Sequence, residues 1–179
     1  PYTTLFRSEI ADKYYEEQME LAEYIMEQPD TGMSVAFFHV TSNGLINVRK
    51  PGDYISRMIE LTGGRYILDS DEGSNDNMLS TMNMQMEDFY IAARDADIII
   101  YNSAIGGELS SVDELISRNS LFADYKAVQN GSVYTTTEEL FQQTTGMAQF
   151  MSELRGVLTG EEASAEYIKK VDQQKLGHK

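Results

Sequence analysis

The chain has 179 residues, contains no cysteine and carries a formal net charge of −15. Such acidity argues against nucleic-acid binding, which needs basic patches, and the missing thiols exclude disulfides and thiol chemistry. With 41% hydrophobic and 24% charged residues, the composition is that of a globular domain, and no apolar run approaches the roughly 20 residues of a membrane span. The absence of cysteine suits an extracytoplasmic bacterial protein.

The amino-terminal segment divides into two parts. Residues 1–8 (PYTTLFRS) match the translation of a common sequencing-adapter oligonucleotide, so we expect them to be an artefact that lies outside the fold. Residues 9–28 predict one long helix, because apolar positions such as Leu21 and Ile25 alternate with glutamates until Pro29 ends the pattern.

A strand–helix–strand crossover follows in residues 33–69. Ser34–Val40 is an apolar run typical of a buried parallel strand. A helix that begins near Pro51 ends at Gly63-Gly64, before a strand at Arg65–Leu68. Between the first strand and this helix, Thr41–Lys50 is predicted to be a loop. Ligands bind outside the carboxyl ends of such strands, so this loop is the first candidate site.

Further strands and helices alternate after this unit. We expect an extended methionine-rich segment at Thr81–Met86, strands at Ala96–Tyr101 and Ser132–Thr135, and helices at Glu87–Asp95, Ser111–Ser117, Glu138–Leu158 and Glu161–Lys170. This alternation predicts an α/β fold, three-layered and Rossmann-like, with a mostly parallel central sheet.

Motifs for catalysis are missing. The sequence lacks a GxGxxG turn, a P-loop, HExxH and GxSxG, and its only histidines are His39, in an apolar strand, and His178, near the end. We interpret His39 as a hydrogen-bonded core residue rather than a metal ligand. Asp69–Ser80 departs from the EF-hand pattern, and the methionines of Thr81–Met86 are more typical of packing than of a copper site. We therefore expect no enzyme, no catalytic residue, no metal site and no cofactor.

Three pieces of sequence carry a resemblance to a known family. They are KPGDYISRMIELTGG with its helix-ending glycines, ARDADIIIYN, and AVQNGSVY, which follows the family's AV-x-N-G-x-V-Y signature. With these pieces the chain resembles the carboxyl-terminal lobe of the substrate-binding proteins of iron-siderophore, haem and cobalamin ABC importers. The resemblance implies that residues 9–28 are the helix connecting two lobes, that residues 33–170 form the carboxyl-terminal lobe, that residues 171–179 are a tail, and that the amino-terminal lobe is missing.

The resemblance also implies a binding function. Members of this family work outside the cytoplasm, hold a bulky metal chelate between two lobes joined by a rigid helix, and deliver it to a membrane permease. We therefore expect an extracytoplasmic protein whose ligand is a ferric siderophore, haem or cobalamin and whose partner is an ABC transporter permease. Contact with the membrane is expected only through a lipid anchor that this fragment lacks.

Two sets of site residues follow. Glu87 matches a family glutamate that docks on permease arginines, although Gln85 stands where the family has Ser or Thr; the other interpretation is an acid stabilised by the helix dipole. The basic pair Arg49-Lys50 favours an anionic ligand, unless both are solvated loop charges. Ligand contacts are expected on strand-end loops, at Asn43, Arg49, Lys50, Asn102, Tyr134 and Thr136.

Two alternatives stay open at this point. The first is a flavodoxin-like enzyme or regulator domain that binds a small molecule, for which Thr41–Gly44 is a faint phosphate-binding loop. The second is a receptor for bare metal ions, which the scarcity of histidine disfavours. Iron chelate, haem and cobalamin are not separated by the sequence.

Overall fold

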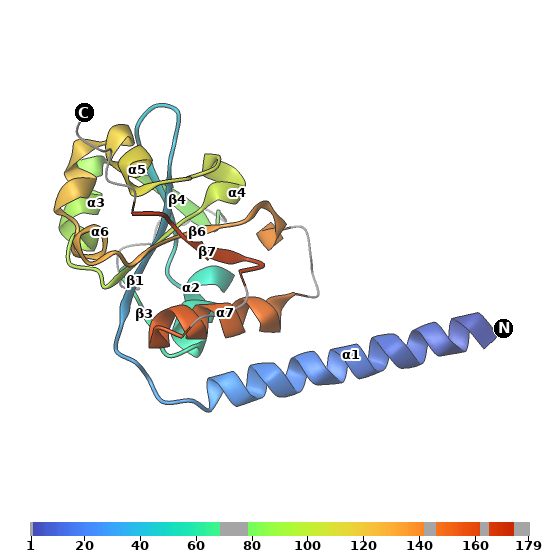
Figure 1. Ribbon diagram of the computed structural model, residues 1–179. Coiled ribbons are helices and arrows are strands. Elements are labelled where there is room, and N and C mark those ends of the chain that lie inside the picture. The colour runs from blue at the N-terminus through green and yellow to red at the C-terminus, as the bar shows by residue number, and fades with distance from the viewer. Residues whose placement is uncertain (1, 69–78, 142–145, 162–164, 174–179) are drawn as a thin grey trace.

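The computed structural model describes residues 2–68, 79–141, 146–161 and 165–173, with side chains from residue 11 onward except at 141. Figure 1 shows a layered α/β body from which the long helix α1 (Tyr2–Met26) projects. The predicted helix over residues 9–28 is therefore present, and it continues through residues 2–8 without a break.

Within these residues, one sheet of seven strands has the order β4-β2-β1-β5-β6-β7, with β3 beside the start of β1. The strands are β1 (Ser34–Val40), β2 (Ile46–Arg49), β3 (Arg65–Tyr66), β4 (Thr81–Met84), β5 (Ile98–Tyr101), β6 (Val133–Thr136) and β7 (Ile168–Lys170).

The centre of the sheet is parallel. β1 pairs in parallel with β3 and β5, and β5 pairs in parallel with β6. All of β5 and the stretch Val35–Phe38 of β1 are buried, as expected for strands covered on both faces. The predicted α/β class with layered helices and a parallel centre is confirmed.

Helices cover both faces. Phe37 and Phe38 point to opposite faces because side chains alternate along a strand. Phe38 packs on Phe89 and Phe122, with ring centroids 4.6 and 5.4 Å apart. Their elements therefore lie on one face, and Figure 1 shows α2 and α7 on the other. The helices are α2 (Tyr54–Leu61), α3 (Met86–Ala93), α4 (Ser103–Gly106), α5 (Val112–Arg118), α6 (Lys126–Asn130) and α7 (Met147–Thr159), with 3₁₀ turns η1 (Ser120–Asp124) and η2 (Glu138–Phe141).

The predicted loop Thr41–Lys50 is wrong in its second half. Ile46–Arg49 forms β2, which pairs antiparallel with β1 through Phe38↔Val48 and Val40↔Ile46. The turn between them is closed by hydrogen bonds from Thr41 N to Leu45 O and from Gly44 N to Thr41 O, 2.8 and 3.0 Å long. Gly44 has φ +80°, which only glycine adopts at low cost. The crossover from β1 through α2 to β3 therefore contains a hairpin.

Three boundaries also differ from the prediction. Glu138–Leu158 is not one helix but η2 followed by α7, while residues 142–145 lie outside the described part. Glu161–Lys170 was expected to be helical, yet Ile168–Lys170 is β7, paired antiparallel with β6. The expected tail begins later, because Val171 N still donates to Val133 O at 2.9 Å. Of the rejected calcium loop Asp69–Ser80, residues 69–78 lie outside the description.

Among its described side chains, helix α1 packs on the body mainly near its carboxyl end. Ile25 is buried, while the side chains of Tyr15 and Tyr24 are 66% and 64% exposed. Arg155 of α7 fixes the turn after the helix: its Nη1 donates to Pro29 O at 2.8 Å and to Thr62 O at 3.0 Å. Among the described residues, no helix is long and apolar enough to cross a membrane.

Candidate ligand site

The carboxyl edge of the parallel strands is the candidate site. Strands β1, β5 and β6 run in the same direction, so the residues that follow Val40, Tyr101 and Thr136 meet at one edge of the sheet. Helix α4 follows β5 directly and divides this edge into two hollows.

The first hollow, between the ends of β1 and β5, has a volume of about 740 Å³. We call it the β1–β5 hollow. It is lined by His39, Val40, Thr41, Ser42, Gly44, Ile105, Gly106, Gly107 and Arg118. Ile105 is 57% exposed at its rim. The lining mixes backbone, hydroxyl and aliphatic groups and contains no carboxylate among the described residues.

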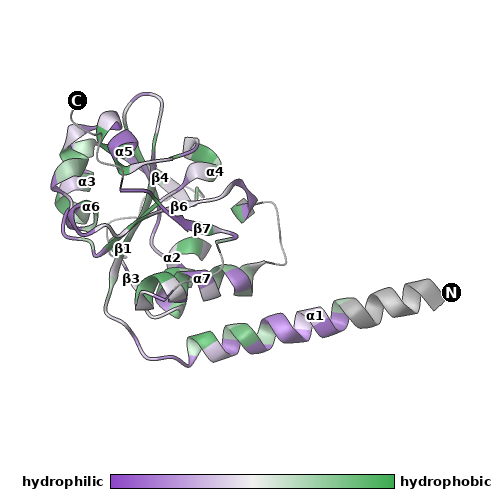
Figure 2. Cartoon of the chain, viewed as in Figure 1, coloured by the Kyte–Doolittle hydropathy of each residue, from purple (hydrophilic) through white to green (hydrophobic). Residues whose placement is uncertain are grey.

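The second hollow, between the ends of β5 and β6 and strand β7, has a volume of about 570 Å³, and we call it the β6–β7 hollow. Its floor contains Ser103 and Thr135, whose hydroxyls are hydrogen-bonded to each other. Figure 2 shows hydrophilic residues along β7 at this edge. Among the described residues, its charged lining consists of Lys169, Lys170, Glu108, Glu138, Glu139, Glu166 and Asp172. The hollow is therefore net acidic.

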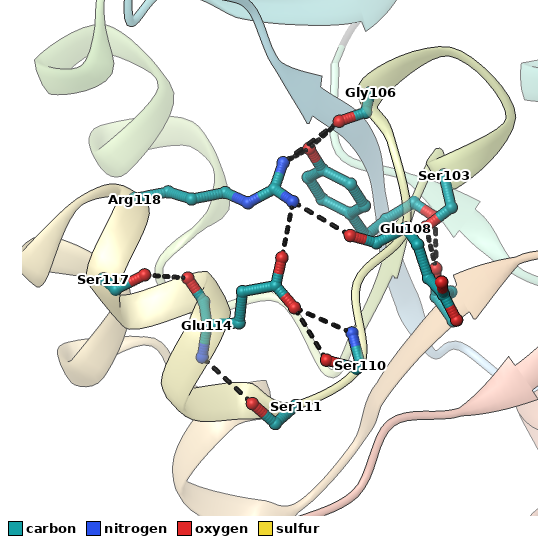
Figure 3. A network of polar contacts seen from close by, with 10 residues as sticks. Ser103, Gly106, Glu108, Ser110, Ser111, Glu114, Ser117 and Arg118 are labelled. Carbon is teal, nitrogen blue, oxygen red and sulfur yellow. Dashed lines mark hydrogen bonds and ion pairs between the residues drawn. The ribbon is translucent and has the colours of Figure 1, made fainter.

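Arg118 bonds to the segment that separates the two hollows (Figure 3). Its Nη1 donates to Gly106 O at 3.1 Å and to the Tyr101 hydroxyl, and its Nη2 donates to Glu108 O at 3.0 Å. The same guanidinium lies over the Tyr101 ring, 4.9 Å from its centroid. One side chain thus ties α5 to the segment that follows α4.

Glu114 completes this network one helical turn earlier. Its Oε1 accepts from Arg118 Nη2 at 2.9 Å, and its Oε2 accepts from Ser110 N and Ser110 Oγ at 3.0 and 2.9 Å. The hydrogen bond from the Ser110 backbone, followed by that from Arg118, lowers the pKa of Glu114. The carboxylate therefore stays ionised and neutralises the Arg118 charge.

His39 lies in the β1–β5 hollow but is only 8% exposed. Burial, and then the charge of Arg49, lowers the pKa of His39. An imidazole that ordinarily titrates near pH 6.5 is thus neutral at pH 7.

The structure brings some of the predicted contacts to this edge. Thr136 is buried and lines the β6–β7 hollow. Asn102, also buried, begins α4 between the two hollows, and its Oδ1 has no hydrogen-bond partner among the described residues. Asn43 is exposed in the β1–β2 turn, where it accepts from Thr41 Oγ1 at 2.6 Å. Tyr134 is half-buried on β6, under the Lys170 ammonium at 6.0 Å from the ring centroid.

Arg49 and Lys50 lie elsewhere. The hairpin reverses the chain, so Arg49, one residue beyond the Phe38↔Val48 pair, is carried away from the carboxyl edge. Both side chains are buried, which contradicts their interpretation as solvated loop charges. Arg49 is paired with Asp53, 3.7 Å away, and neither basic residue lines either hollow.

The sequence interpretation missed two sets of residues at this edge. Arg118 and Glu114 form an i,i+4 pair of opposite charge, but the predicted helix Ser111–Ser117 ends one residue before Arg118, whereas α5 includes it. Lys169 and Lys170 are also an adjacent basic pair, but the helix expected at Glu161–Lys170 concealed their place on a sheet edge.

Glu87 lies away from both hollows, in the first turn of α3, and is exposed. Gln85 occupies the N-cap position without a side-chain hydrogen bond to the helix.

For metals, the part of the chain that the structure describes contains no group of three or more His, Asp or Glu side chains able to hold an ion.

Comparison with known proteins identifies the fold. No protein-family model matches the chain, and no curated protein matches it in sequence. Solved structures do match. An ABC transporter substrate-binding protein from Listeria monocytogenes matches with a TM-score of 0.59 and 18% identity, over 89% of this chain and 60% of that one. The periplasmic heme binding protein HutB of Vibrio cholerae matches with a TM-score of 0.62 and 16% identity, over 85% of this chain and 56% of that one. The chain has the fold of a substrate-binding protein lobe. The siderophore periplasmic binding protein from the fuscachelin gene cluster of Thermobifida fusca shares this fold, with a TM-score of 0.57 and 18% identity over 86% of this chain and 54% of that one.

The lobe spans between 54% and 60% of the length of these three proteins. At such identities the likeness establishes the fold, and the resemblance that the sequence indicated is confirmed at that level. The proteins with this fold are binding proteins, which is consistent with the expectation that the chain is not an enzyme.

Proposed function

We propose that this chain is the carboxyl-terminal lobe, with its connecting helix, of an extracytoplasmic solute-binding protein of an ABC importer. In this proposal the complete protein holds a ferric siderophore, haem or cobalamin against the carboxyl edge of the lobe and delivers it to a permease. The observation that carries the proposal is the fold: its solved neighbours include proteins titled as binding a siderophore, haem and vitamin B12, and the lobe spans about half of each.

The geometry of the edge supports this proposal over a flavodoxin-like enzyme. A phosphate-binding loop after β1 needs free backbone N–H groups, but Thr41 N and Gly44 N are used in closing the β1–β2 turn. The two hollows are open. An open surface of this size suits one half of a site that a second lobe completes.

The test is a titration of the product of the complete reading frame that contains this chain. Intrinsic protein fluorescence, to which the 11 tyrosines of this chain contribute, reports quenching by an absorbing chelate. We expect saturable binding of a ferric siderophore, haem or cyanocobalamin with a dissociation constant of roughly 1 μM or lower. Failure of every chelate to bind would overturn the proposal, and a bound flavin in the purified protein would favour the alternative.

Permease docking is the second part of the proposal. Glu87 is exposed at the positive end of the α3 dipole, where a carboxylate is both stabilised and available to an arginine. In the complete protein, Glu87→Arg should reduce uptake by at least about tenfold without changing ligand affinity. Asp88→Arg is the matched control, because it makes the same charge change in the same helical turn. Equal uptake by the Glu87 variant and the wild type would remove the docking role.

A further inference from the structure

The charge of the ligand can be inferred from what the cationic groups near the carboxyl edge already contact. A cation recognises an anionic ligand when its hydrogen-bond donors are free to face that ligand. An anionic ligand in the β1–β5 hollow would therefore need an arginine or a histidine there with donors that the protein does not already use.

Arg118 is the only arginine or lysine among the described residues that line this hollow. Both of its terminal nitrogens are used within the protein, on Glu114, Tyr101 and two backbone carbonyls. Its positive charge is matched by Glu114 at 2.9 Å. The guanidinium therefore acts as a structural tie, and the charge that it presents to the hollow is largely cancelled.

Neither neighbouring group presents a charged donor to the hollow. His39 is neutral at pH 7, because burial and then Arg49 lower its pKa. Arg49 is buried against Asp53 at 3.7 Å, with both side chains less than 10% exposed. The rest of the lining consists of backbone, hydroxyl groups and the aliphatic Ile105 and Val40.

The net negative charge of the β6–β7 hollow, on the other side of α4, disfavours binding of an anionic ligand nearby. Its described lining contains five carboxylates against two ammonium groups. Charges closer together than the Debye length, about 8 Å at physiological salt, are only partly screened.

From these contacts, and resting on the function proposed above, we infer that the β1–β5 hollow receives an uncharged part of the ligand and that the protein prefers neutral or cationic metal chelates to anionic ones. The class favoured is an uncharged iron(III) trihydroxamate or a corrinoid. The disfavoured class comprises iron(III) tris-catecholates and haem with its propionates. This inference reverses the expectation of an anionic ligand, which depended on Arg49 and Lys50.

The experiment compares chelates of different charge on the complete protein. A neutral ferric trihydroxamate, cyanocobalamin, a ferric tris-catecholate and haem are titrated by intrinsic protein fluorescence at about 0.15 M salt, roughly physiological ionic strength. We expect the best neutral chelate to bind at least about tenfold more tightly than either anionic one. Tighter binding of an anionic chelate would overturn the inference while leaving the proposed function intact. Absence of binding by all four would overturn the proposed function and the inference together.

A single substitution tests the role given to Arg118. Glu114→Gln keeps an oxygen that can accept a hydrogen bond but removes the charge that neutralises the guanidinium. The variant should bind the tris-catecholate about fivefold more tightly and the trihydroxamate unchanged. Glu60→Gln on α2 removes one negative charge away from the edge and should change neither affinity. Equal affinities in the Glu114 variant and the wild type would show that the Arg118 charge does not govern selection.

Discussion

At the scale of single residues, Asp97 shows how one carboxylate joins three elements. It accepts from Ser34 N and Ser34 Oγ, both at 2.8 Å, and pairs with Lys126 at 2.5 Å. Burial would raise the pKa of Asp97, but the Lys126 and Ser34 hydrogen bonds outweigh it and lower the pKa from 3.8 to about 2. The ionised carboxylate therefore stabilises the fold above its ordinary pKa, and this contribution is lost as the pH falls through about 2.

We therefore predict that Asp97→Asn lowers the free energy of unfolding by about 2 kcal/mol at pH 7. The difference between variant and wild type should be about half as large at pH 3, because part of the wild-type contribution has then been lost. Urea unfolding of both proteins at pH 7, 5 and 3 measures this change. Asp95→Asn, at an exposed neighbouring position, is the control and should be nearly neutral. If the difference in unfolding free energy between the variant and the wild type did not vary with pH, the stabilisation would not come from the ionised Asp97 carboxylate.

Glu153 is a second residue whose importance the sequence does not reveal. It is fully buried on α7, and its carboxylate accepts from the backbone N–H groups of Glu166, Tyr167 and Ile168 at 3.1, 2.8 and 2.8 Å. These bonds hold the chain just before and at the start of β7. The spacing of apolar residues along a helix predicts which face of the helix is buried. It does not predict that an acidic residue such as Glu153 is buried, because the groups that bond its carboxylate are backbone N–H groups elsewhere in the chain.

Glu153→Leu should therefore destabilise the protein by roughly 3 kcal/mol or more, because three buried donors lose their acceptor. Glu153→Gln keeps one good acceptor and should cost less. Urea unfolding at pH 7 gives both values, and Glu60→Leu on the exposed face of α2 is a control expected within about 0.5 kcal/mol of the wild type. If the Leu variant were as stable as that control, the three hydrogen bonds would not anchor β7.

At the scale of elements, what the sequence predicts depends on where the stabilising contacts lie. β1 and β5 are continuous apolar runs because both faces are covered, so composition alone predicts them. β4 and β7 are short edge strands, and β2 is a short strand between β4 and β1. Their pairing depends on partners far along the chain, such as Val48↔Met82 and Thr136↔Ile168. No local pattern encodes such partners. The candidate edge of the sheet was therefore predictable, whereas the side chains brought to it by the β1–β2 hairpin and by β7 were not.

The junction between α1 and the body is an element-scale contact that one residue controls. Arg155 links Pro29 O to Thr62 O, and Thr31 Oγ1 donates to Gly63 O at 2.8 Å beside it. Arg155→Leu keeps apolar packing but removes both bonds, so residues 27–32 should be cleaved several-fold faster in limited proteolysis and the free energy of unfolding should fall by about 1–2 kcal/mol. Arg57→Leu, on an exposed part of α2, is the control. Unchanged cleavage in the Arg155 variant would mean that the apolar contacts of Leu21 and Ile25 anchor the helix without these hydrogen bonds.

At the scale of the whole molecule, α1 presents an apolar stripe that the body does not cover. Tyr15, Met19 and Met26 recur at i, i+4 and i+11 and therefore share one face of the helix. Their side chains are 66%, 44% and 44% exposed. The face beside them, with Leu21 and Ile25, is the one that packs on the body. Large apolar side chains gathered on one projecting helix are typical of a surface that meets another part of the same protein.

The proposed function predicts what covers this stripe. If the complete protein has a second lobe joined through α1, that lobe should bury part of the helix, and the amides of residues 11–24 should then open mainly with the fold as a whole. Hydrogen exchange of these amides should be at least about tenfold slower in the complete protein than in this chain, while the amides of β5 should exchange alike in both. The comparison within one experiment separates local covering from a general gain in stability, because a general gain would slow β5 as well. Equal exchange along α1 in the two proteins would mean that nothing else packs on the helix, and the two-lobed arrangement would then be wrong.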